Sequence, residues 1–475
     1  MVLPTFRAAE LLVARGNFYS RHYFYLRTRG AKMNHEHIKL ANRAIFKLRH
    51  NQWYLIDTKK GSEERFLVGD DSKKVLSFLF RGESITETCR EFGISDKELH
   101  DFIGILERER VVSFTDKPQD SSARCYDTDP PLDSINTLIT NACNLRCAHC
   151  YVGSGEATAD ELDGKEWIKI LKQALQLGAF GVNVSGGEPL LHRDFREIAE
   201  FIASVPTFNA NLNTNGTQIK VGQEELLSRA FTTVQISIDD SIGERHDAFR
   251  GSKGCFKKSV KAIEKLVAYG VEVNVGFSLT PHSLSALDGV VEFCENIGVS
   301  ALGIGLVANN GRASINNLAP SVGPRSMYQD EFMALMYRKL RELSERNTTL
   351  RILPPFRISD SKVVPLQEKQ YICNGDNSQV IYVMADGTGM PCDKLPPHAF
   401  GCGNLKRQSL IDVWMSDKMT AFKRMSIRQL PKCRECPHLK ICGGACVARS
   451  FQTGGLLESP DWTACVIAQK IAAEQ

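Results

Sequence analysis

Three cysteines stand close together in the segment from Thr140 to Tyr151. Cys143, Cys147 and Cys150 are separated by three and by two residues. Three thiolates on one loop can bind three irons of a cubane [4Fe–4S] cluster and leave the fourth iron free for another ligand. A structural zinc ion would need four protein ligands, usually from two separated pairs. The spacing therefore favours an iron–sulfur site with one open position.

A second group of cysteines lies near the carboxyl end. Cys373 precedes a hairpin that we expect to turn at Asp386 and Gly387, and Cys392 follows it. The others are Cys433, Cys436, Cys442, Cys446 and Cys465. Clustered cysteines in a long chain without a secretion signal indicate metal ligands, and a zinc ribbon is the alternative for this group. The isolated cysteines should behave as small buried hydrophobic residues: Cys89, Cys125, Cys255 and Cys294.

Strand-like and helix-like patterns alternate through the middle of the chain, which predicts a parallel β/α sheet or barrel. Strands are expected at 135–140, 181–185, 210–214, 234–239, 271–279 and 301–307. Helices are expected at 165–177, 195–204, 224–230, 256–269 and 284–297. Six β/α units are too few for a closed eight-stranded barrel, so we expect an open, partial (β/α)6 barrel.

Polar residues follow several of these strands, at the edge where ligands gather in such folds. The cysteine loop follows the first strand. Gly186 and Gly187 after the second strand allow a backbone to approach a ligand, and Glu188 could accept from a ligand amine, although a tight turn is the alternative. Ser237 and Asp239 point to the same side of the fourth strand.

Together these residues resemble the radical S-adenosylmethionine (SAM) superfamily. His149 stands in the aromatic-preferring position before the third cysteine of its Cys-x3-Cys-x2-Cys loop. The resemblance implies that SAM binds the open iron, and that its cleavage gives a 5′-deoxyadenosyl radical that abstracts a substrate hydrogen. It also implies SAM contacts from Gly186, Gly187, Glu188, Ser237, Asp239 and Arg250. A salt bridge at a helix start is the alternative for Arg250.

The carboxyl-terminal cysteines match the pattern of the SPASM domain, which carries auxiliary clusters in radical enzymes that act on peptides and proteins. By this resemblance one auxiliary cluster is bound by Cys433, Cys436, Cys442 and Cys465. The other is bound by Cys373, Cys392 and Cys446, and has either an open iron or a further ligand such as Cys402. The chain would then hold three [4Fe–4S] clusters.

The amino-terminal part has a different pattern. Residues 1–40 are rich in arginine and aromatic residues, and form either a partner-binding or nucleic-acid-binding arm or a solvated extension. Strands are expected at 44–49, 52–57 and 64–68, and helices at 72–80, 84–92 and 95–110, the last with a capping box at Ser95 and Glu98. This winged-helix-like unit could bind DNA, but the acidic residues of its third helix oppose phosphate contact. It resembles the recognition element (RRE) of enzymes that mature ribosomally made peptides (RiPPs), where a leader peptide adds a strand to the sheet edge.

These patterns predict six regions. They are a basic and aromatic extension (1–40), an RRE-like leader-binding domain (41–116), a linker (117–132), the partial barrel (133–320), a helical bridge (321–370) and the SPASM domain (371–475).

Composition agrees with several globular domains. The 475 residues are 43% hydrophobic and 24% charged, with a net charge of +4 that does not by itself suggest nucleic acid. No apolar run is long enough for a membrane span, and Arg7 and Glu10 interrupt any signal-like core. We therefore expect a cytoplasmic protein without membrane or nucleic-acid partners.

The function that follows is a radical SAM maturase of a ribosomally made peptide. We expect two partners, a precursor peptide with a leader and an electron donor such as flavodoxin or ferredoxin. A thioether crosslink is the first expected product, and carbon–carbon or carbon–oxygen crosslinks, backbone excision and epimerisation are alternatives. A sulfatase-maturase-like enzyme, an iron–sulfur carrier and a zinc scaffold are the rival functions.

Overall fold

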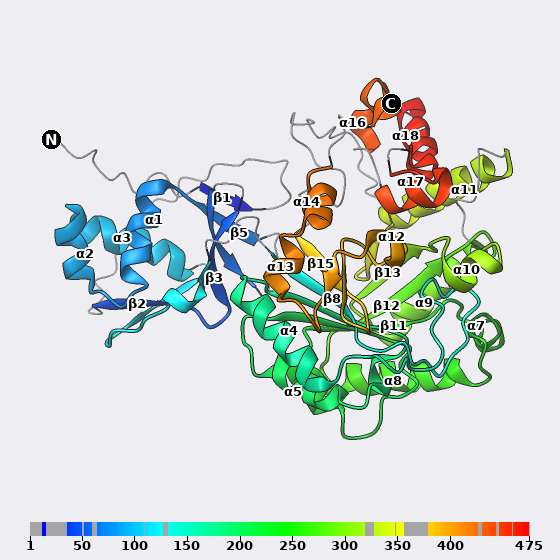
Figure 1. Cartoon of the computed structure of the whole chain (residues 1–475), viewed down its shortest axis with the longest axis horizontal. Coiled ribbons are helices and arrows are strands. Elements are labelled where there is room, and N and C mark those ends of the chain that lie inside the picture. The colour runs from blue at the N-terminus through cyan, green and yellow to red at the C-terminus, as the bar shows by residue number, and fades with distance from the viewer. Residues whose placement is uncertain are drawn as a thin grey trace. The chain divides into compact units, whose positions relative to one another are not determined.

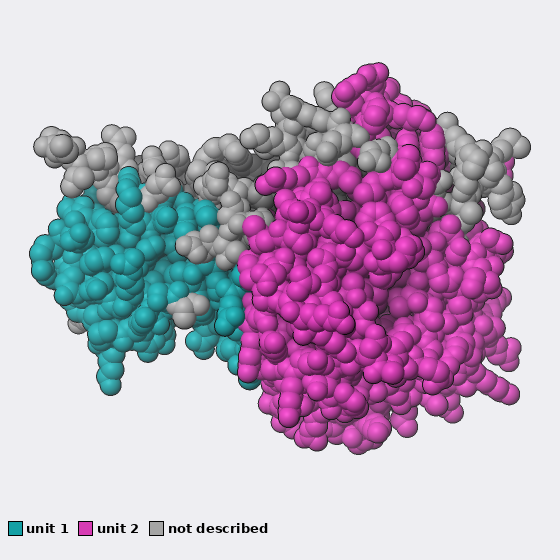
Figure 2. Space-filling view, viewed as in Figure 1, with its two compact units in different colours: residues 1–134, 174–182, 204–209 teal, residues 135–173, 183–203, 210–475 magenta. Residues whose placement is uncertain are grey.

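The computed structural model describes these residues of the chain: 12–15, 36–49, 52–58, 64–108, 110–126, 132–318, 327–346, 348–355, 379–425, 430–442, 446–457 and 459–474. They fall into two compact units, coloured separately in Figure 2. Unit 1 is made of residues 1–134, 174–182 and 204–209, and unit 2 of residues 135–173, 183–203 and 210–475. None of the described helices combines the length and the apolar character that a membrane span requires.

A ten-stranded sheet forms the centre of the larger part, with the order β14-β13-β12-β11-β10-β9-β8-β15-β16-β17. All six predicted strands are present: β8 (Ser134–Leu138), β9 (Gly181–Ser185), β10 (Asn209–Thr214), β11 (Thr233–Ser237), β12 (Val273–Leu279) and β13 (Ala301–Leu306). So are the five helices: α4 (Gly164–Gln176), α5 (Phe195–Ala203), α6 (Glu224–Ala230), α8 (Cys255–Tyr269) and α9 (Leu287–Ile297). Strands β10 to β13 pair in parallel, which confirms the α/β prediction.

The sheet is larger than expected at both ends. Strand β14 (Arg351–Leu353) pairs in parallel with β13, although it follows helix α11 (Met327–Glu345) in the predicted helical bridge. Its three residues are too few to show a strand pattern in the sequence. Strands β15 (Val380–Val383), β16 (Thr388–Met390) and β17 (Gly403–Asn404) extend the opposite end beside β8.

The hairpin predicted at Asp386 and Gly387 is confirmed. Tyr382 of β15 lies opposite Met390 of β16. Gly387 has a φ of +85°, which side chains disfavour, and Asp386 Oδ1 accepts from the backbone N–H of Thr388 at 2.9 Å. Cys392 therefore follows directly from a strand of the main sheet.

Helices of one to four turns complete this part of the chain (Figure 1). They are α7 (Gly243–Arg250), α10 (Gly311–Ile315), α12 (Pro397–Phe400), α13 (Leu410–Trp414), α14 (Asp417–Lys423), α15 (Pro431–Arg434), α16 (Leu439–Cys442), α17 (Val447–Gly454) and α18 (Trp462–Glu474).

The small domain has the predicted strands β3 (Ala44–Arg49), β4 (Gln52–Asp57) and β5 (Glu64–Val68). The predicted helices also form, as α1 (Asp70–Leu79), α2 (Ile85–Phe92) and α3 (Asp96–Arg108). The capping box is confirmed, because Glu98 accepts from the Ser95 backbone N–H at 3.1 Å and Ser95 Oγ accepts from the Glu98 N–H at 3.3 Å. Apolar side chains of the sheet and helices share one core: Phe46, Leu55, Leu76, Phe102 and Leu106.

Four strands of this unit were not expected from the sequence. They are β1 (Leu12–Arg15), β2 (His37–Leu40), β6 (Val112–Thr115) and β7 (Cys125–Tyr126). The five-stranded sheet has the order β1-β5-β4-β3-β7, and β2 pairs with β6 separately. Of the predicted extension at 1–40, residues 1–11 and 16–35 lie outside the described residues.

A fully buried lysine joins β3 to the rest of unit 1. Lys47 has no exposed surface, and its Nζ lies 3.0 Å from Asp133 Oδ1. The same amine donates to the carbonyls of Leu132 at 2.5 Å and Gly178 at 2.7 Å. All four residues belong to unit 1. Because a buried charge is stable only when it is paired and hydrogen-bonded, Lys47 fixes these three segments together.

We expect Lys47→Met to destabilise this junction by about 3–5 kcal/mol, because Asp133 would stay buried without its partner. Hydrogen exchange of peptides that cover β3 and β4 should then show a large loss of protection. Lys74→Met is the control, because Lys74 forms an exposed pair with Asp71 and should change little. Equal protection in the two variants would contradict the proposed role of Lys47.

Candidate active site

The three cysteines of the cysteine loop (residues 140–151) lie together in one packed cluster with Leu145 and Cys255. Burial raises the pKa of Cys143 to about 11 and also raises the pKa of Cys147. The N–H of Leu145 donates to Cys143 Sγ at 3.4 Å, and Arg250 Nη1 donates to Cys147 Sγ at 3.8 Å. Donors aimed at sulfur stabilise thiolates, and bound iron would supply the positive charge that deprotonates them. The three thiols therefore fit the ligand set of a [4Fe–4S] cluster.

The Gly-Gly-Glu segment after β9 packs directly on the cysteine loop. The backbone N–H of Gly187 donates to the Thr140 carbonyl, and that of Glu188 donates to the Ala142 carbonyl, both at 2.7 Å. A Cβ atom would come within 2.6 Å of Thr140 O if placed on Gly186, and within 2.2 Å of Ala142 O if placed on Gly187. Both glycines are thus required by the approach of two backbones. Their predicted contact with SAM stays a prediction.

Glu188 is completely buried and bound on both carboxylate oxygens. Oε1 accepts from Thr214 Oγ1 at 2.6 Å and from the N–H of Leu190 at 3.2 Å, and Oε2 accepts from the N–H of Asn215 at 2.8 Å. Burial raises the pKa of Glu188 to about 7, although these three hydrogen bonds oppose the rise. A ligand amine, as predicted for this residue, would have to share the carboxylate with these donors.

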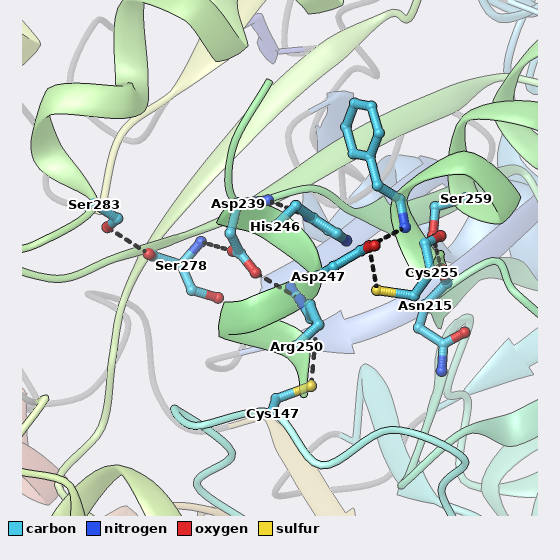
Figure 3. Close-up of polar contacts among 11 residues, drawn as sticks. Cys147, Asn215, Asp239, His246, Asp247, Arg250, Cys255, Ser259, Ser278 and Ser283 are labelled. Carbon is cyan, nitrogen blue, oxygen red and sulfur yellow. Dashed lines mark hydrogen bonds and ion pairs between the residues drawn. The ribbon is translucent and has the colours of Figure 1, made fainter. Parts of the chain in front are cut away.

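Asp239 and Arg250 form a buried ion pair beneath Cys147 (Figure 3). Arg250 Nε donates to Asp239 Oδ2 at 2.5 Å, and Asp239 Oδ1 accepts from the N–H of Ser278 at 2.8 Å. Burial is the largest single influence on the pKa of Asp239 and would raise it, but the charge of Arg250, with smaller contributions from His149, His246 and the Ser278 N–H, holds the pKa below its usual value. The salt bridge considered for Arg250 is therefore present, at the last residue of α7. Ser237 ends β11 half-buried, and its SAM contact stays a prediction.

His149 stacks on Phe249, with ring centroids 4.4 Å apart and planes 12° from parallel. Burial lowers the pKa of His149 to about 4, so its imidazole is neutral at physiological pH. Its Nδ1 has no hydrogen-bond partner among the described residues. A neutral, stacked ring at this position matches the aromatic preference noted in the sequence.

The first residues of α10 also bind the cysteine loop, although no motif in the sequence indicated this contact. Arg312 donates from Nε to the Cys147 carbonyl and from Nη1 to the Ser154 carbonyl, both at 2.8 Å. Its backbone N–H donates to the Cys150 carbonyl at 2.9 Å. Gly311 has a φ of +55°, and a Cβ there would meet Cys150 O at 2.6 Å. The one available signal was that these residues follow β13, at the ligand-binding edge of the sheet.

Cys255 lies among the cluster cysteines but has a different partner. Its thiol donates to Asp247 Oδ1 at 3.2 Å, and burial raises its pKa to about 12. Asp247 also accepts from the backbone N–H groups of Gly254 at 2.5 Å and Phe256 at 2.8 Å, at the start of α8 (Figure 3). Cys255 is buried as expected, and it acts as a neutral thiol in a helix cap.

Four carboxyl-terminal cysteines that the sequence assigns to one auxiliary cluster influence one another electrostatically. Cys465 interacts with Cys433, Cys436 and Cys442, and Cys433 interacts with Cys436 and Cys442. Burial raises the pKa of Cys433, and raises that of Cys465 to about 12. Cys433 of α15, Cys442 of α16, Cys465 of α18 and Cys436, which follows α15, supply four thiols. Their role as the ligands of one auxiliary cluster stays a prediction.

Cys392 and Cys446 both lie near Lys394. Both pack in one core cluster. The carboxylate of Asp393 raises the pKa of Lys394, burial opposes the rise, and Cys392 and Cys446 add to it. Cys373, the third predicted ligand, lies outside the described residues. Cys402 is buried against other groups, since its thiol contacts the Phe400 carbonyl at 3.4 Å.

Two polar contacts in this region were missed by sequence reasoning. The Tyr151 hydroxyl donates to Asp393 Oδ2 at 2.6 Å, which connects the residue after Cys150 to the residue after Cys392. Asp461 accepts from the N–H of Cys446 at 3.1 Å and from Arg449 Nη2 at 2.8 Å, and so fixes the Cys446 backbone. Neither acid stands in a recognisable motif.

Helices α4, α5 and α8 lie along one side of the sheet (Figure 1). The half-buried positions of its strands, here called the inner face, carry amides, glycines and other uncharged residues. Burial alternates along β9 to β12, with the apolar residues fully buried. The half-buried positions hold no charged residue, and include Asn183, Asn211, Asn213, Gln235 and Asn274. Gln235 lies flat across the next strands, because a Cβ at Gly276 would come within 2.9 Å of its Nε2. Asn274 Oδ1 has no hydrogen-bond partner among the described residues.

Comparison with known families matches the two cysteine regions separately. Residues 137–294 match the radical SAM superfamily, and residues 373–437 match SPASM, an iron–sulfur cluster-binding domain. The first match contains Cys143, Cys147 and Cys150, and the second contains Cys373, Cys392, Cys433 and Cys436.

Several known proteins are similar to this chain, each over a different share of its length. The chain is 35% identical over 182 residues to the sporulation killing factor maturation protein SkfB of Bacillus subtilis, which covers 38% of the chain and 44% of SkfB. It is 26% identical over 345 residues to the AdoMet-dependent heme synthase of Oleidesulfovibrio alaskensis, which covers 69% of the chain and 86% of that protein. The structure of Streptococcus suis SuiB bound to its precursor peptide SuiA has a TM-score of 0.65 at 16% identity, over 90% of the chain and 99% of SuiB. The last similarity is one of fold.

The raised pKa of Glu188 predicts a pH dependence of stability. Since the pKa is about 7 in the fold and 4.5 ordinarily, the folded state binds this proton more tightly. The stabilisation is complete below pH 4.5 and is lost as pH rises through 7, by at most about 3 kcal/mol. Glu188→Gln should remove this slope in anaerobic urea unfolding between pH 5 and 8, whereas the exposed control Glu244→Gln should keep it. Parallel slopes in Glu188→Gln and the unsubstituted chain would contradict the assignment.

Proposed function

Because the chain is a radical SAM enzyme with an iron–sulfur cluster-binding SPASM domain, we propose that it modifies a ribosomally made precursor peptide. Its cofactors are [4Fe–4S] clusters and SAM, which supply the one-electron chemistry that removes a hydrogen from the substrate when they are bound. A thioether crosslink is the product that we propose first. The similarity to SkfB, a maturation protein, supports a peptide substrate.

The uncharged amide side chains of the inner face are the main observation in favour of a peptide substrate. Its side-chain amides both donate and accept hydrogen bonds, as an extended peptide backbone requires. The half-buried positions of β9 to β13 are all uncharged. An anionic small molecule would call for cations there. The heme synthase similarity therefore gives the second candidate, a tetrapyrrole, less support from this face than a peptide.

We further propose three clusters. Cys143, Cys147 and Cys150 hold the SAM cluster, Cys433, Cys436, Cys442 and Cys465 hold one auxiliary cluster, and Cys373, Cys392 and Cys446 hold the other. Gly186, Gly187, Glu188, Ser237, Asp239 and Arg250 form the SAM site. A cytoplasmic flavodoxin or ferredoxin supplies the electrons.

The small domain at residues 41–116 is proposed as the winged-helix-like docking site of the leader. Its sheet β3 to β5 supports this role, because an edge strand can pair with an extended peptide through main-chain hydrogen bonds. Docking the leader there would raise the effective concentration of the core segment at the inner face.

Mass spectrometry of a co-expressed candidate precursor tests the function. We expect a crosslinked peptide that has lost two hydrogens. Excision would give a larger loss, and epimerisation would show only as isotope uptake in heavy water. The purified enzyme should contain about 12 iron atoms per chain, at four per cubane. An unmodified precursor beside turnover of a tetrapyrrole, or zinc in place of iron, would contradict the proposal.

Gln235→Leu tests the inner face separately. Loss of the carboxamide should raise KM for the precursor by about 5- to 10-fold, the effect of roughly one hydrogen bond, and leave peptide-independent cleavage of SAM unchanged. Gln176→Leu, the same change at an exposed position of α4, is the control. An unchanged KM in Gln235→Leu would place the peptide elsewhere.

A further inference from the structure

Strand β1 covers the edge of the small domain's sheet. It pairs antiparallel with β5, with Leu12 opposite Leu67 and Arg15 opposite Glu64. Four of the five residues of β5 are covered in this way. Figure 1 shows the two strands side by side.

Without β1, strand β5 would be the edge strand of the domain's sheet. Strands β3, β4 and β5 follow one another as antiparallel neighbours, so β5 has one side left for a further strand. At the opposite end, β3 is already paired with β7, which has only two residues. An unpaired β5 would expose a row of N–H and C=O groups that accepts any compatible extended segment.

Strand β1, which occupies this edge, is separated along the chain from the other strands of the domain. β1 has four residues and is separated from the next described residue, Glu36, by residues 16–35. Four residues form few ladder hydrogen bonds, each contributing about 0.5–1.5 kcal/mol net. Such a strand stays paired mainly because it belongs to the same chain as β5, and covalent linkage gives an effective concentration on the order of 1 mM.

We propose that β1 is a built-in competitor for the peptide-binding edge of β5. A precursor leader pairs with β5 only after β1 leaves, so the chain's own amino-terminal segment sets a threshold for leader binding. The identity of the competing peptide rests on the proposed function, whereas occupancy of β5 by β1 does not.

The effect of β1 on the affinity for a leader can be calculated. A tethered strand lowers the apparent affinity of a competing peptide by the factor 1 + C/Kd, where C is its effective concentration and Kd its own dissociation constant. If the Kd is about 0.1 mM, a C of about 1 mM makes the factor roughly tenfold. The same sequence added as a free peptide measures this Kd directly.

The test compares three proteins, each a full chain with its cofactors: the unsubstituted chain and two double variants. In Val13→Pro/Ala14→Pro, two prolines remove N–H groups from β1 and disfavour strand pairing. Ala8→Pro/Ala9→Pro is the matched control, with the same prolines in the same extension outside β1. The probe is a fluorescent synthetic peptide with the sequence of residues 8–19 of this chain.

We expect hydrogen exchange at residues 64–68 to be at least about tenfold faster in Val13→Pro/Ala14→Pro than in the other two proteins. The probe should bind this variant about tenfold more tightly than the unsubstituted chain or the control. Equal exchange and equal probe binding in all three proteins would show that β1 does not occupy β5, and would overturn the proposal.

A precursor leader completes the experiment. It should also bind Val13→Pro/Ala14→Pro about tenfold more tightly. Weaker binding would make β1 part of the leader site, and unchanged binding with an open β5 would place the leader elsewhere; both results overturn the competition. If β5 opens and the probe binds but no precursor is modified, the proposed function fails and the occupancy of β5 by β1 stands.

Discussion

The cysteine loop has almost no regular secondary structure, so its buried peptide groups need partners from other segments, and this need organises the site. The loop's carbonyls at Thr140 and Ala142 accept from the segment after β9, and those at Cys147 and Cys150 accept from Arg312 after β13. Its N–H groups at Arg146 and Ala148 donate to the carbonyls of Arg250 and Phe249 at 3.2 and 2.9 Å. The segments after β9 and β13 and the last turn of α7 thus position the cysteines, mainly through contacts with the backbone of the loop.

This arrangement explains why glycine and buried charge occur where they do. Gly186, Gly187 and Gly311 stand where two backbones meet, and any Cβ there would collide with a carbonyl oxygen. Arg250 is buried because α7 must bring its last turn against the loop, and Asp239 compensates the cost of that burial. The guanidinium that results lies beside Cys147, where it favours the thiolate. Arg250 therefore both packs α7 against the loop and places a positive charge beside Cys147.

Local patterns in the sequence were enough to predict the six central strands, the three helices of the small domain and the hairpin at Asp386 and Gly387. In each case the signal lies within a few neighbouring residues, as alternation, capping or spacing. Arg312, Asp461 and the Tyr151–Asp393 contact could not be predicted in this way, because their partners lie 12 to 242 residues away. Strand β14 could not be predicted for another reason, because a strand of three residues is too short to show a periodic pattern in the sequence. Sequence reasoning thus identified the metal-binding chemistry and missed the residues that hold it in place.

The two proposed peptide-binding features, the β5 edge and the inner face, differ in chemistry, and this difference suggests separate roles for them. An edge strand such as β5 recognises main-chain groups along several residues, so it can supply affinity for a leader. The inner face, with uncharged amides and glycines, offers hydrogen bonds without demanding a particular charge on the core. An enzyme whose reactive species abstracts hydrogen must hold the core in register and must tolerate the new bond that forms in it. Weak, neutral contacts at the inner face meet that requirement only if binding energy comes from elsewhere, which makes control of the β5 edge by β1 an effective point of regulation.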